Sequence, residues 1–404
     1  MENSKKLSVR WLYIAVGVVA MLFAGVLYAW SILKSPLAAE FGWGASDLAL
    51  NFTLAMTFFC FGGLLGAKLS KKFGHKLSLF LAGVLSAAGF SLTAALNGVP
   101  VIVLYLTYGL LAGLGIGISY NVVISAVSAW FPDKKGLCSG CLMMGFGASA
   151  LLLGNLADAL FKSSIGWRAT FVILGVSIFV VLSLAALILK KPREDIIFPE
   201  KKVKASANQV SGEELTSMQM LRRRSFWMAF FCISFLAAVG SSVISFAKDL
   251  SLSVNAPEAL AVSLVGVLSV CNGLGRIITG AVFDIIGCKK TMLCANLLTT
   301  LAAAVTLVAV YAGSLPLCIA GVCLTGMSYG ACPTITAACT STFFGMKHFQ
   351  SNMALMTFTV MIGSFIATAS NKVLEVSNGY TAPFIMLLAL TVVALVLNLF
   401  IKKP

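Results

Sequence analysis

Charge is what this sequence has least of. Only 11% of its 404 residues are Asp, Glu, Lys or Arg, and two are His, whereas about 25% of an average soluble domain is charged. Because 59% of the residues are hydrophobic and the mean hydropathy is +0.98, an ordinary soluble domain is excluded. We find no intramembrane His/Glu cluster, paired acids or activated nucleophile, so no enzyme, metal site or cofactor is expected. The chain is predicted to be an integral membrane protein.

Long hydrophobic runs are abundant instead. A membrane-spanning helix needs about 20 mostly apolar residues. Dividing the sequence at its charged and turn-forming segments gives twelve such stretches: 11–33, 46–67, 77–96, 101–131, 136–161, 167–189, 226–247, 259–283, 291–312, 316–344, 349–371 and 379–401. No small-residue cleavage site follows the first stretch, which therefore reads as a retained span rather than a signal peptide. The predicted fold class is an all-α membrane protein with twelve transmembrane helices.

The basic residues predict the orientation, because Lys and Arg accumulate in cytoplasmic loops. With the N-terminus inside, 23 of the 29 Lys and Arg are cytoplasmic, five lie at outer ends or loops, and Arg276 alone lies within the membrane. We therefore expect a multi-pass protein of the cell (inner) membrane with both termini in the cytoplasm. The net charge of +15 is then explained by topology, and no nucleic-acid partner is needed.

The chain divides around a polar segment at 190–225, which carries nine Lys and Arg. We predict an N-terminal six-helix half at 1–189, a basic cytoplasmic linker, and a C-terminal six-helix half at 226–404. Within the linker, the capping-box pattern at 211–214 and the basic residues at 222–224 predict a short interfacial helix. The halves echo each other: GISY ending at Tyr120 matches GMSY ending at Tyr329. Six-span repeats are typical of secondary transporters.

Eleven cysteines are present, most of them within apolar spans among Gly, Ala and Leu. They are interpreted as small packing residues. Cys138 and Cys141 have CxxC spacing, but they lie at the start of a predicted helix without the βαβ context of a redox motif. The glycine-rich run GLGIG at 113–117 lies inside an apolar helix, so it indicates close helix packing rather than a nucleotide loop.

Arg276 is the residue whose position most needs an explanation. It is the only charged residue among the 25 between Glu258 and Asp284. A charge near the bilayer centre costs about 3 kcal/mol on insertion scales, so a charged residue there usually has a function. The alternative is structural: Arg276 could cap a helix end or pair with another residue. However, the spans offer few acids as partners, since Asp158 and Asp249 lie near outer ends and Asp284 lies at the inner boundary.

At the end of span 8, the run Gly280-x-x-x-Asp284-x-x-Gly287-x-Lys289-Lys290 resembles the loop motif of the major facilitator superfamily. The resemblance implies the major facilitator fold, with Gly280, Asp284 and Gly287 forming a conformational latch in which the Asp engages a neighbouring helix end. The equivalent run at 67–74 departs from the motif, because it has Ala67 for the first Gly and Lys71 for the Asp. Only the C-terminal copy is therefore a candidate latch.

A narrower resemblance covers most of the chain. Its motifs, each weak alone but matching in order and spacing, are Tyr28-Ala-Trp-Ser31, Phe41-Gly-Trp43, Tyr108-Gly-Leu-Leu-Ala-Gly-Leu-Gly-Ile-Gly117, Tyr120-Asn121, Trp130-Phe-Pro-Asp-Lys-Lys-Gly-Leu137, Gly145-Phe-Gly147, Gly166-Trp-Arg-Ala-Thr-Phe171 and Asn272-Gly-Leu-Gly-Arg276. Together they resemble the oxalate/formate antiporter family, a neighbour of the monocarboxylate transporters.

This resemblance implies that Arg276 binds a substrate carboxylate. A guanidinium offers a rigid fork of donors suited to two carboxylate oxygens. The other expected substrate-binding residues are Tyr28, Tyr120, Tyr329, Asn121 and Asn272. Phenol groups can donate to carboxylate oxygens; alternatively, the three tyrosines pack at helix interfaces with their hydroxyls reaching water.

Two departures from the relatives narrow the expected substrate. Oxalate exchangers of this family carry a second cation in span 11, where this chain has Val360 or Met361. Proton-coupled monocarboxylate transporters place an Asp four residues before the span 8 arginine, where this chain has Asn272. One fixed charge suits one carboxylate better than two. Both histidines lie in predicted cytoplasmic loops, so no buried proton carrier is evident. Whether a proton or a counter-anion is coupled to transport stays open.

The main hypothesis is therefore an alternating-access transporter of small organic carboxylates in the lipid bilayer, most simply monocarboxylates such as lactate, pyruvate or formate. The alternative within transport is an oxalate or other dicarboxylate antiporter. Outside transport, a receptor-like or assembly protein on the same fold is kept, because a fold alone does not establish function; the departure at Lys71 favours it.

Overall fold

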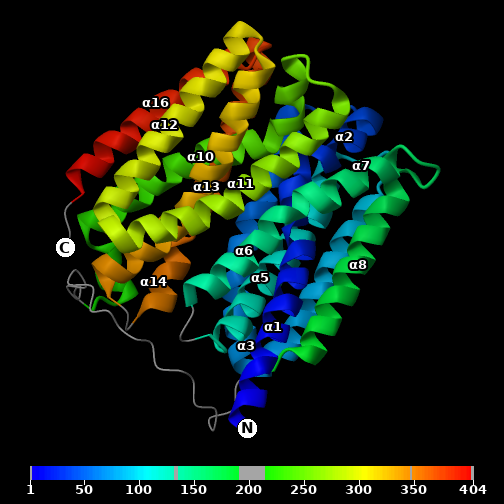
Figure 1. Cartoon of the computed structure of the whole chain (residues 1–404). Coiled ribbons are helices and arrows are strands. Elements are labelled where there is room, and N and C mark those ends of the chain that lie inside the picture. Colours follow the sequence, from blue (N-terminus) through cyan, green and yellow to red (C-terminus); the bar gives the residue numbers. More distant parts are fainter. Residues whose placement is uncertain (1, 132–134, 191–213, 346–347, 402–404) are drawn as a thin grey trace. The chain divides into compact units, whose positions relative to one another are not determined.

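The computed structural model describes residues 2–131, 135–190, 214–345 and 348–401. Every regular element within these ranges is helical (Figure 1). The chain folds into two compact units: unit 1 comprises Met1–Ala29 and Leu54–Ala205, and unit 2 comprises Trp30–Thr53 and Ser206–Pro404. The predicted division into six-helix halves with a linker at 190–225 stays a prediction, and most of that linker, 191–213, lies outside the described residues.

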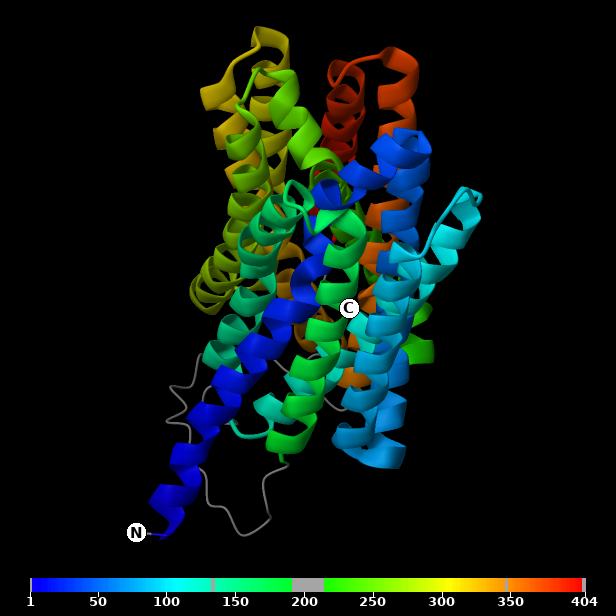
Figure 2. The ribbon, with the colours of Figure 1, turned by 90° about the vertical axis from the view of Figure 1, so that its right-hand side faces the viewer.

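Unit 1 contains the following helices: α1 (Glu2–Ala24), η1 (Gly25–Ala29), α3 (Ala45–Ala94) from Leu54 onward, α4 (Val101–Leu104), η2 (Tyr105–Ala112), α5 (Gly113–Ser128), α6 (Lys135–Ser149), η3 (Ala150–Gly154), α7 (Asn155–Phe161) and α8 (Gly166–Ile188). Helix α1 packs against α5, α6 and α8. Figure 2 shows α1 in blue beside α8 in green. The predicted spans at 101–131 and 136–161 are each interrupted by a wide turn, η2 and η3, without changing direction into a loop.

Unit 2 contains α2 (Trp30–Phe41), the start of α3, α9 (Ser217–Leu221), α10 (Arg224–Ser253), α11 (Glu258–Ile286), α12 (Cys288–Ala312), α13 (Leu315–Phe344), α14 (Phe349–Met356), α15 (Phe358–Ser377) and α16 (Thr381–Phe400). Helix α13 packs against α10, α11 and α12, and α16 packs against α12 and α10. In Figure 1, α12 and α16 lie side by side in yellow and red.

Ten helices among the described residues are long and apolar enough to cross a membrane. One of them, α3, has 50 residues and breaks at Gly74 (φ 80°, ψ 165°), so it supplies the two predicted spans at 46–67 and 77–96. The predicted span at 349–371 is α14 followed by α15, which meet at Thr357. The break in α3 confirms two separate spans there, and with the span at 349–371 divided at Thr357 the helices account for all twelve predicted spans.

Many hydroxyl groups inside these apolar helices are satisfied by their own helix, although several buried ones, such as those of Ser241, Ser242 and Thr325, have no partner among the described residues. Thr299 donates to the carbonyl of Ala295 at 2.8 Å, and Thr336 donates to that of Cys332 at 2.8 Å. Such i to i−4 bonds remove the cost of placing a hydroxyl in a membrane without water. The polar residues of the spans therefore do not have to bind ligands to be tolerated.

Two motifs noted in the sequence hold helix ends in unit 1. Arg168 Nη1 donates to the carbonyls of Ala94 and Leu96 at 2.7 and 2.5 Å, which satisfies the C-terminal end of α3. Trp130 Nε1 donates to the carbonyl of Lys190 at 2.6 Å beyond the end of α8. These members of the family motifs are thus structural.

The predicted helix at the end of the linker is present but shorter than expected. Thr216, rather than Ser211, precedes it: the Thr216 side chain accepts from the backbone N–H of Gln219, and the Gln219 side chain accepts from that of Thr216. Ser211 lies outside the described residues. The result is the five-residue helix α9, which ends at Leu221, before the basic residues 222–224.

Candidate functional site

Arg276 and Asn272 lie one turn apart on α11, and both are buried, with 9% and 1% of their surfaces exposed. Arg276 Nε donates to Asn272 Oδ1 at 3.3 Å. The amide oxygen therefore orients the guanidinium group. Asn272 Nδ2 has no hydrogen-bond partner among the described residues, so a buried N–H donor lies on the same side chain that holds the arginine.

Close packing between α11 and α13 positions this pair. A methyl group added at Gly330 would collide with the backbone carbonyl of Asn272, and one added at Gly275 would collide with that of Met327. Glycines at both places let the two backbones touch, as small residues do in membrane helix pairs. Thr334 Oγ1 on α13 also donates to the carbonyl oxygen of Arg276 at 3.4 Å. The turn of α11 that carries Arg276 is thus held by α13.

Tyr329 is the neighbour of Gly330 on α13 and is 3% exposed. Its ring lies directly over Gly240 of α10, where an added methyl group would run into it. Unit 2 therefore places three of the six predicted binding residues, Arg276, Asn272 and Tyr329, on two helices that touch at Gly330.

The other predicted tyrosines belong to an aromatic cluster in unit 1. Tyr28 and Tyr120 both contact Phe146, with ring centroids 5.1 and 5.3 Å apart. Phe59 contacts Tyr120 at 5.0 Å. The hydroxyl of Tyr120 donates to the sulfur of Met143 at 3.0 Å. We call Tyr28, Phe59, Tyr120, Met143 and Phe146 the aromatic cluster.

Sequence reasoning missed three members of this cluster, Phe59, Met143 and Phe146. The GFG motif at 145–147 was available as a signal for Phe146, whereas nothing in the sequence marks Met143. Asn121, the last predicted residue, follows Tyr120 and is exposed. Its Nδ2 lies against Gly63, where an added methyl group would collide with it.

The predicted latch residues lie at the end of α11. Gly287 separates α11 from α12 with φ 77° and ψ 172°, backbone angles that glycine adopts far more readily than other residues. Around Gly280 there is room, since the nearest atom to an added methyl group is Thr334 Cγ2 at 4.0 Å. The side chain of Asp284 lies outside the described residues, so the latch contact stays a prediction.

The acids at the predicted outer ends of the spans lie close to lysines. Asp249 Oδ2 lies 2.8 Å from Lys34 Nζ, and Asp158 Oδ2 lies 2.9 Å from Lys162 Nζ. Lys248 Nζ similarly lies 3.5 Å from Glu258 Oε1. The two acids that the sequence analysis placed near outer ends, Asp158 and Asp249, thus have lysine partners.

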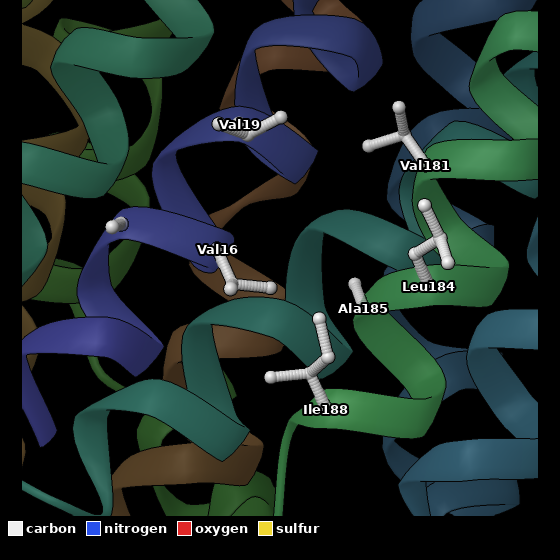
Figure 3. Close-up of a pocket in the computed structure, with 7 residues that line it drawn as sticks. Val16, Val19, Val181, Leu184, Ala185 and Ile188 are labelled. Atoms are coloured by element: carbon white, nitrogen blue, oxygen red, sulfur yellow. The ribbon is translucent and has the colours of Figure 1, made fainter. Parts of the chain in front are cut away.

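A pocket of about 270 Å³ lies elsewhere, between α1 and α8 of unit 1. Its lining is entirely apolar: Ala15, Val16, Val19, Val181, Leu184, Ala185 and Ile188 (Figure 3). It offers no donor to a carboxylate, and none of the predicted binding residues lines it. We therefore exclude it as the binding site for an organic anion.

Sequence comparison identifies the superfamily. The profile of the Major Facilitator Superfamily matches residues 12–368 and 230–404. An uncharacterised transporter of that type from Escherichia coli strain K12, YhjX, is 27% identical over 362 residues, which cover 88% of this chain and 86% of the relative.

Two further relatives carry names that state a substrate. The oxalate:formate antiporter of Oxalobacter formigenes is 30% identical over 297 residues, which cover 72% of this chain and 67% of the relative. Monocarboxylate transporter 11 of Homo sapiens is 31% identical over 151 residues, which cover 37% of this chain and 31% of the relative.

Solved structures share the fold at low sequence identity. The nucleoside transporter NupG matches with a TM-score of 0.73 at 12% identity, covering 98% of this chain and all of the other. A bacterial homologue of the human lysosomal transporter Spinster matches with a TM-score of 0.68 at 14% identity, covering 96% of each chain. The helical fold and the profile match agree, and the chain belongs to the Major Facilitator Superfamily of multi-pass membrane transporters.

Proposed function

We propose that this transporter carries small monocarboxylates by alternating access, and that Arg276 binds the carboxylate. The observation that carries the proposal is the buried Arg276–Asn272 pair on α11. Arginine supplies parallel N–H donors and a permanent charge, which suit a carboxylate. An anion bound beside this charge makes the empty and loaded states differ in electrostatic free energy, and that difference can couple binding to movement.

The neighbouring donors fit the same substrate. Asn272 contributes a buried N–H beside the guanidinium, and Tyr28, Tyr120, Tyr329 and Asn121 are proposed to contribute further polar contacts during the cycle. Hydrogen bonds to a charged group contribute about 1.5–3 kcal/mol each. The names of the relatives support an organic-acid substrate. The proposed orientation has both termini in the cytoplasm, following the distribution of Lys and Arg.

An oxalate or other dicarboxylate antiporter is the second candidate, favoured by the name of the 30% identical relative. A dicarboxylate would require a second cation to match its second charge. Val360 and Met361 occupy the place where the resemblance expects that cation, so a monocarboxylate is the better match. A coupled proton or a counter-anion is left to experiment.

Counterflow in proteoliposomes tests the proposal. Vesicles loaded in turn with lactate, pyruvate, formate and oxalate are assayed with the labelled acids, using the native protein and Arg276→Gln. We expect uptake of at least one monocarboxylate by the native protein, and at least about a tenfold loss in the variant, which corresponds to 1.4 kcal/mol.

Lys372→Gln is the matched control. It also removes one positive charge, but from a side chain that is 68% exposed and paired with Glu375 at 3.5 Å, so transport should persist. Thermal unfolding in detergent verifies that both variants fold. Exchange of oxalate alone would favour the second candidate, and native-like uptake by a folded Arg276→Gln would refute the assigned role.

A further inference from the structure

Three sulfur atoms of unit 2 lie together where α12 begins. Cys288 Sγ and Cys339 Sγ are 3.2 Å apart, and Cys339 Sγ is 3.8 Å from Met292 Sδ. Cys288 is the first residue of α12, Met292 follows one turn later, and Cys339 belongs to the end of α13. Cys288 is 7% exposed, whereas Cys339 and Met292 are completely buried. We call these three residues the sulfur cluster.

The distance between the two thiols is the first argument for chemistry. A disulfide bond is about 2.05 Å long, so the sulfurs must approach by only roughly 1.2 Å to reach bonding distance. The two helices that carry them pack against each other, which keeps the thiols together. A pair of thiols held in contact is the arrangement in which one cysteine is attacked by an oxidant and the other resolves the product.

The environments of Cys288 and Cys339 indicate which thiol attacks the oxidant and which resolves the product. Cys288 follows the Gly287 turn and precedes the exposed residues Lys289 and Lys290. Cys288 keeps 7% of its surface exposed, whereas Cys339 has none exposed. Cys339 is completely buried against Met292, so Cys288 is the more accessible of the two thiols. Cys288 is therefore the attacking thiol and Cys339 the resolving thiol.

We propose that Cys288 and Cys339 form a redox-responsive dithiol that closes to a disulfide when a peroxide is present and thereby slows transport. Cys288 sulfur attacks one peroxide oxygen, breaks the O–O bond, and becomes a sulfenic acid as one water leaves. Cys339 sulfur then displaces the sulfenic oxygen as a second water, which forms the S–S bond. Two thiols and one hydrogen peroxide thus yield one disulfide and two waters.

The position of the bond explains its effect on transport. It would tie the start of α12 to α13, directly beside the Gly287 turn that joins α12 to α11. Helix α13 already touches α11 at Gly330 and Asn272. The disulfide would therefore restrain the turn next to the helix that carries Arg276. This consequence, unlike the bond itself, rests on the proposed transport function.

The first experiment detects the bond without measuring transport. Purified full-length protein is treated with hydrogen peroxide, free thiols are blocked with N-ethylmaleimide, and a digest without reductant is analysed by mass spectrometry. The expected product is a linked pair of peptides containing Cys288 and Cys339, lighter by two hydrogen atoms than their sum. It should be absent from Cys339→Ser and from Cys288→Ala.

A second cysteine contact supplies the matched control. Cys271 of α11 interacts with Cys323 of α13, and the double variant Cys271→Ser/Cys323→Ser should still form the Cys288–Cys339 link. Absence of that link in the native protein would overturn the proposal, and so would oxidation that stops at Met292 sulfoxide or at Cys288 alone.

The second experiment measures exchange in proteoliposomes before and after the same treatment. Peroxide should slow the native protein severalfold, and dithiothreitol should restore the rate, whereas Cys339→Ser and Cys288→Ala should stay unaffected. Linked protein that exchanges at the unlinked rate would overturn the regulatory role. If untreated protein moves no carboxylate, the proposed function fails, while the peptide analysis still decides whether the dithiol closes.

Discussion

The turns that follow the second and the eighth predicted spans have the same backbone conformation. Gly74 has φ 80° and ψ 165°, and Gly287 has φ 77° and ψ 172°. Their surrounding sequences differ, since the first has Lys71 where the second has Asp284. The two units therefore share a backbone feature while their side chains have diverged.

Aligning these turns locates the difference that concerns binding. The turns are 213 residues apart, since 287 minus 74 is 213. Subtracting 213 from 276 makes Gly63 the residue of unit 1 that corresponds to Arg276 in sequence. Arg276 contacts Asn272, whereas Gly63 lies against the amide group of Asn121. Unit 2 therefore has a cation where unit 1 has a glycine and a neutral amide.

Close helix packing, in contrast, is common to both units. A methyl group added at Gly117 of α5 would collide with the carbonyl of Phe59, as one added at Gly330 would with that of Asn272. The comparison teaches that the turns and the close helix contacts are common to both units. Arg276 has no charged counterpart at Gly63, and the specificity of the proposed site is expected to depend on this difference.

The largest effect is expected to be a loss of stability at the close helix contacts that both units share. Gly330→Ala and Gly117→Ala each force a methyl group against a backbone carbonyl that cannot move aside. Such overpacking costs about 1–3 kcal/mol or more, and we expect both variants to fall at the upper end. The midpoint of thermal unfolding in detergent measures the loss.

Gly280→Ala is the control for these variants, because the nearest atom to its methyl group is 4.0 Å away, and it should unfold like the native protein. If Gly330→Ala also did so, α11 and α13 would not need their close contact, and the positioning of Arg276 by α13 would have to be abandoned.

The second-largest effect is a loss of uptake that should differ between the two units. Arg276→Lys keeps the charge but loses the fork of parallel donors, so we expect uptake to fall by about tenfold to a hundredfold, equivalent to losing one charged hydrogen bond. Gly63→Ala, the counterpart in unit 1, presses on the end of the Asn121 side chain, a neutral proposed contact, and should lower uptake by less than Arg276→Lys does. Initial rates of counterflow measure both. Equal losses would contradict the claim that the charged copy dominates binding.

The membrane spans and Arg276 could be predicted from the sequence alone. Apolar runs predicted the spans, because about 20 residues must cross the bilayer whatever their neighbours are. Arg276 could also be identified from the sequence, because a single charge within an apolar span is costly in the membrane and usually has a function. The division of α3 at Gly74 confirms two of these spans, whereas the break at Thr357 within the span at 349–371 was not predicted.

Contacts between helices were beyond sequence reasoning. Met143 accepts from Tyr120 across 23 residues, and Cys288 meets Cys339 across 51. The position of most cysteines among Gly, Ala and Leu in apolar spans indicates packing residues and says nothing of which cysteines meet. Only the packing of α12 against α13 reveals that two of them touch, since which faces meet depends on the side chains of both helices.

The third effect concerns the shared turns. Gly287→Ala and Gly74→Ala place a side chain in a backbone region that costs about 1–3 kcal/mol for residues other than glycine. We expect similar destabilisation from both, measured by thermal unfolding. Gly313→Asn is the control, because φ 60° and ψ 27° lie in the left-handed region that Asn tolerates. Destabilisation by only one of the two would show that the turns are not equivalent.

The smallest effect distinguishes the tyrosines of the two units. Tyr329→Phe and Tyr120→Phe each remove one hydroxyl; if that hydroxyl donates to the substrate, about 0.5–1.5 kcal/mol is lost and KM rises up to about tenfold. Tyr311→Phe, at a position 86% exposed on α12, is the control and should leave KM unchanged. If KM rises with Tyr329→Phe alone, the hydroxyl that contacts the substrate lies with Arg276 in unit 2. The hydrogen bond from Tyr120 to Met143 would then contribute only to packing. A rise with Tyr120→Phe alone would instead mean that the neutral unit supplies a donor, so the charge and the hydroxyl that bind the anion would come from different units.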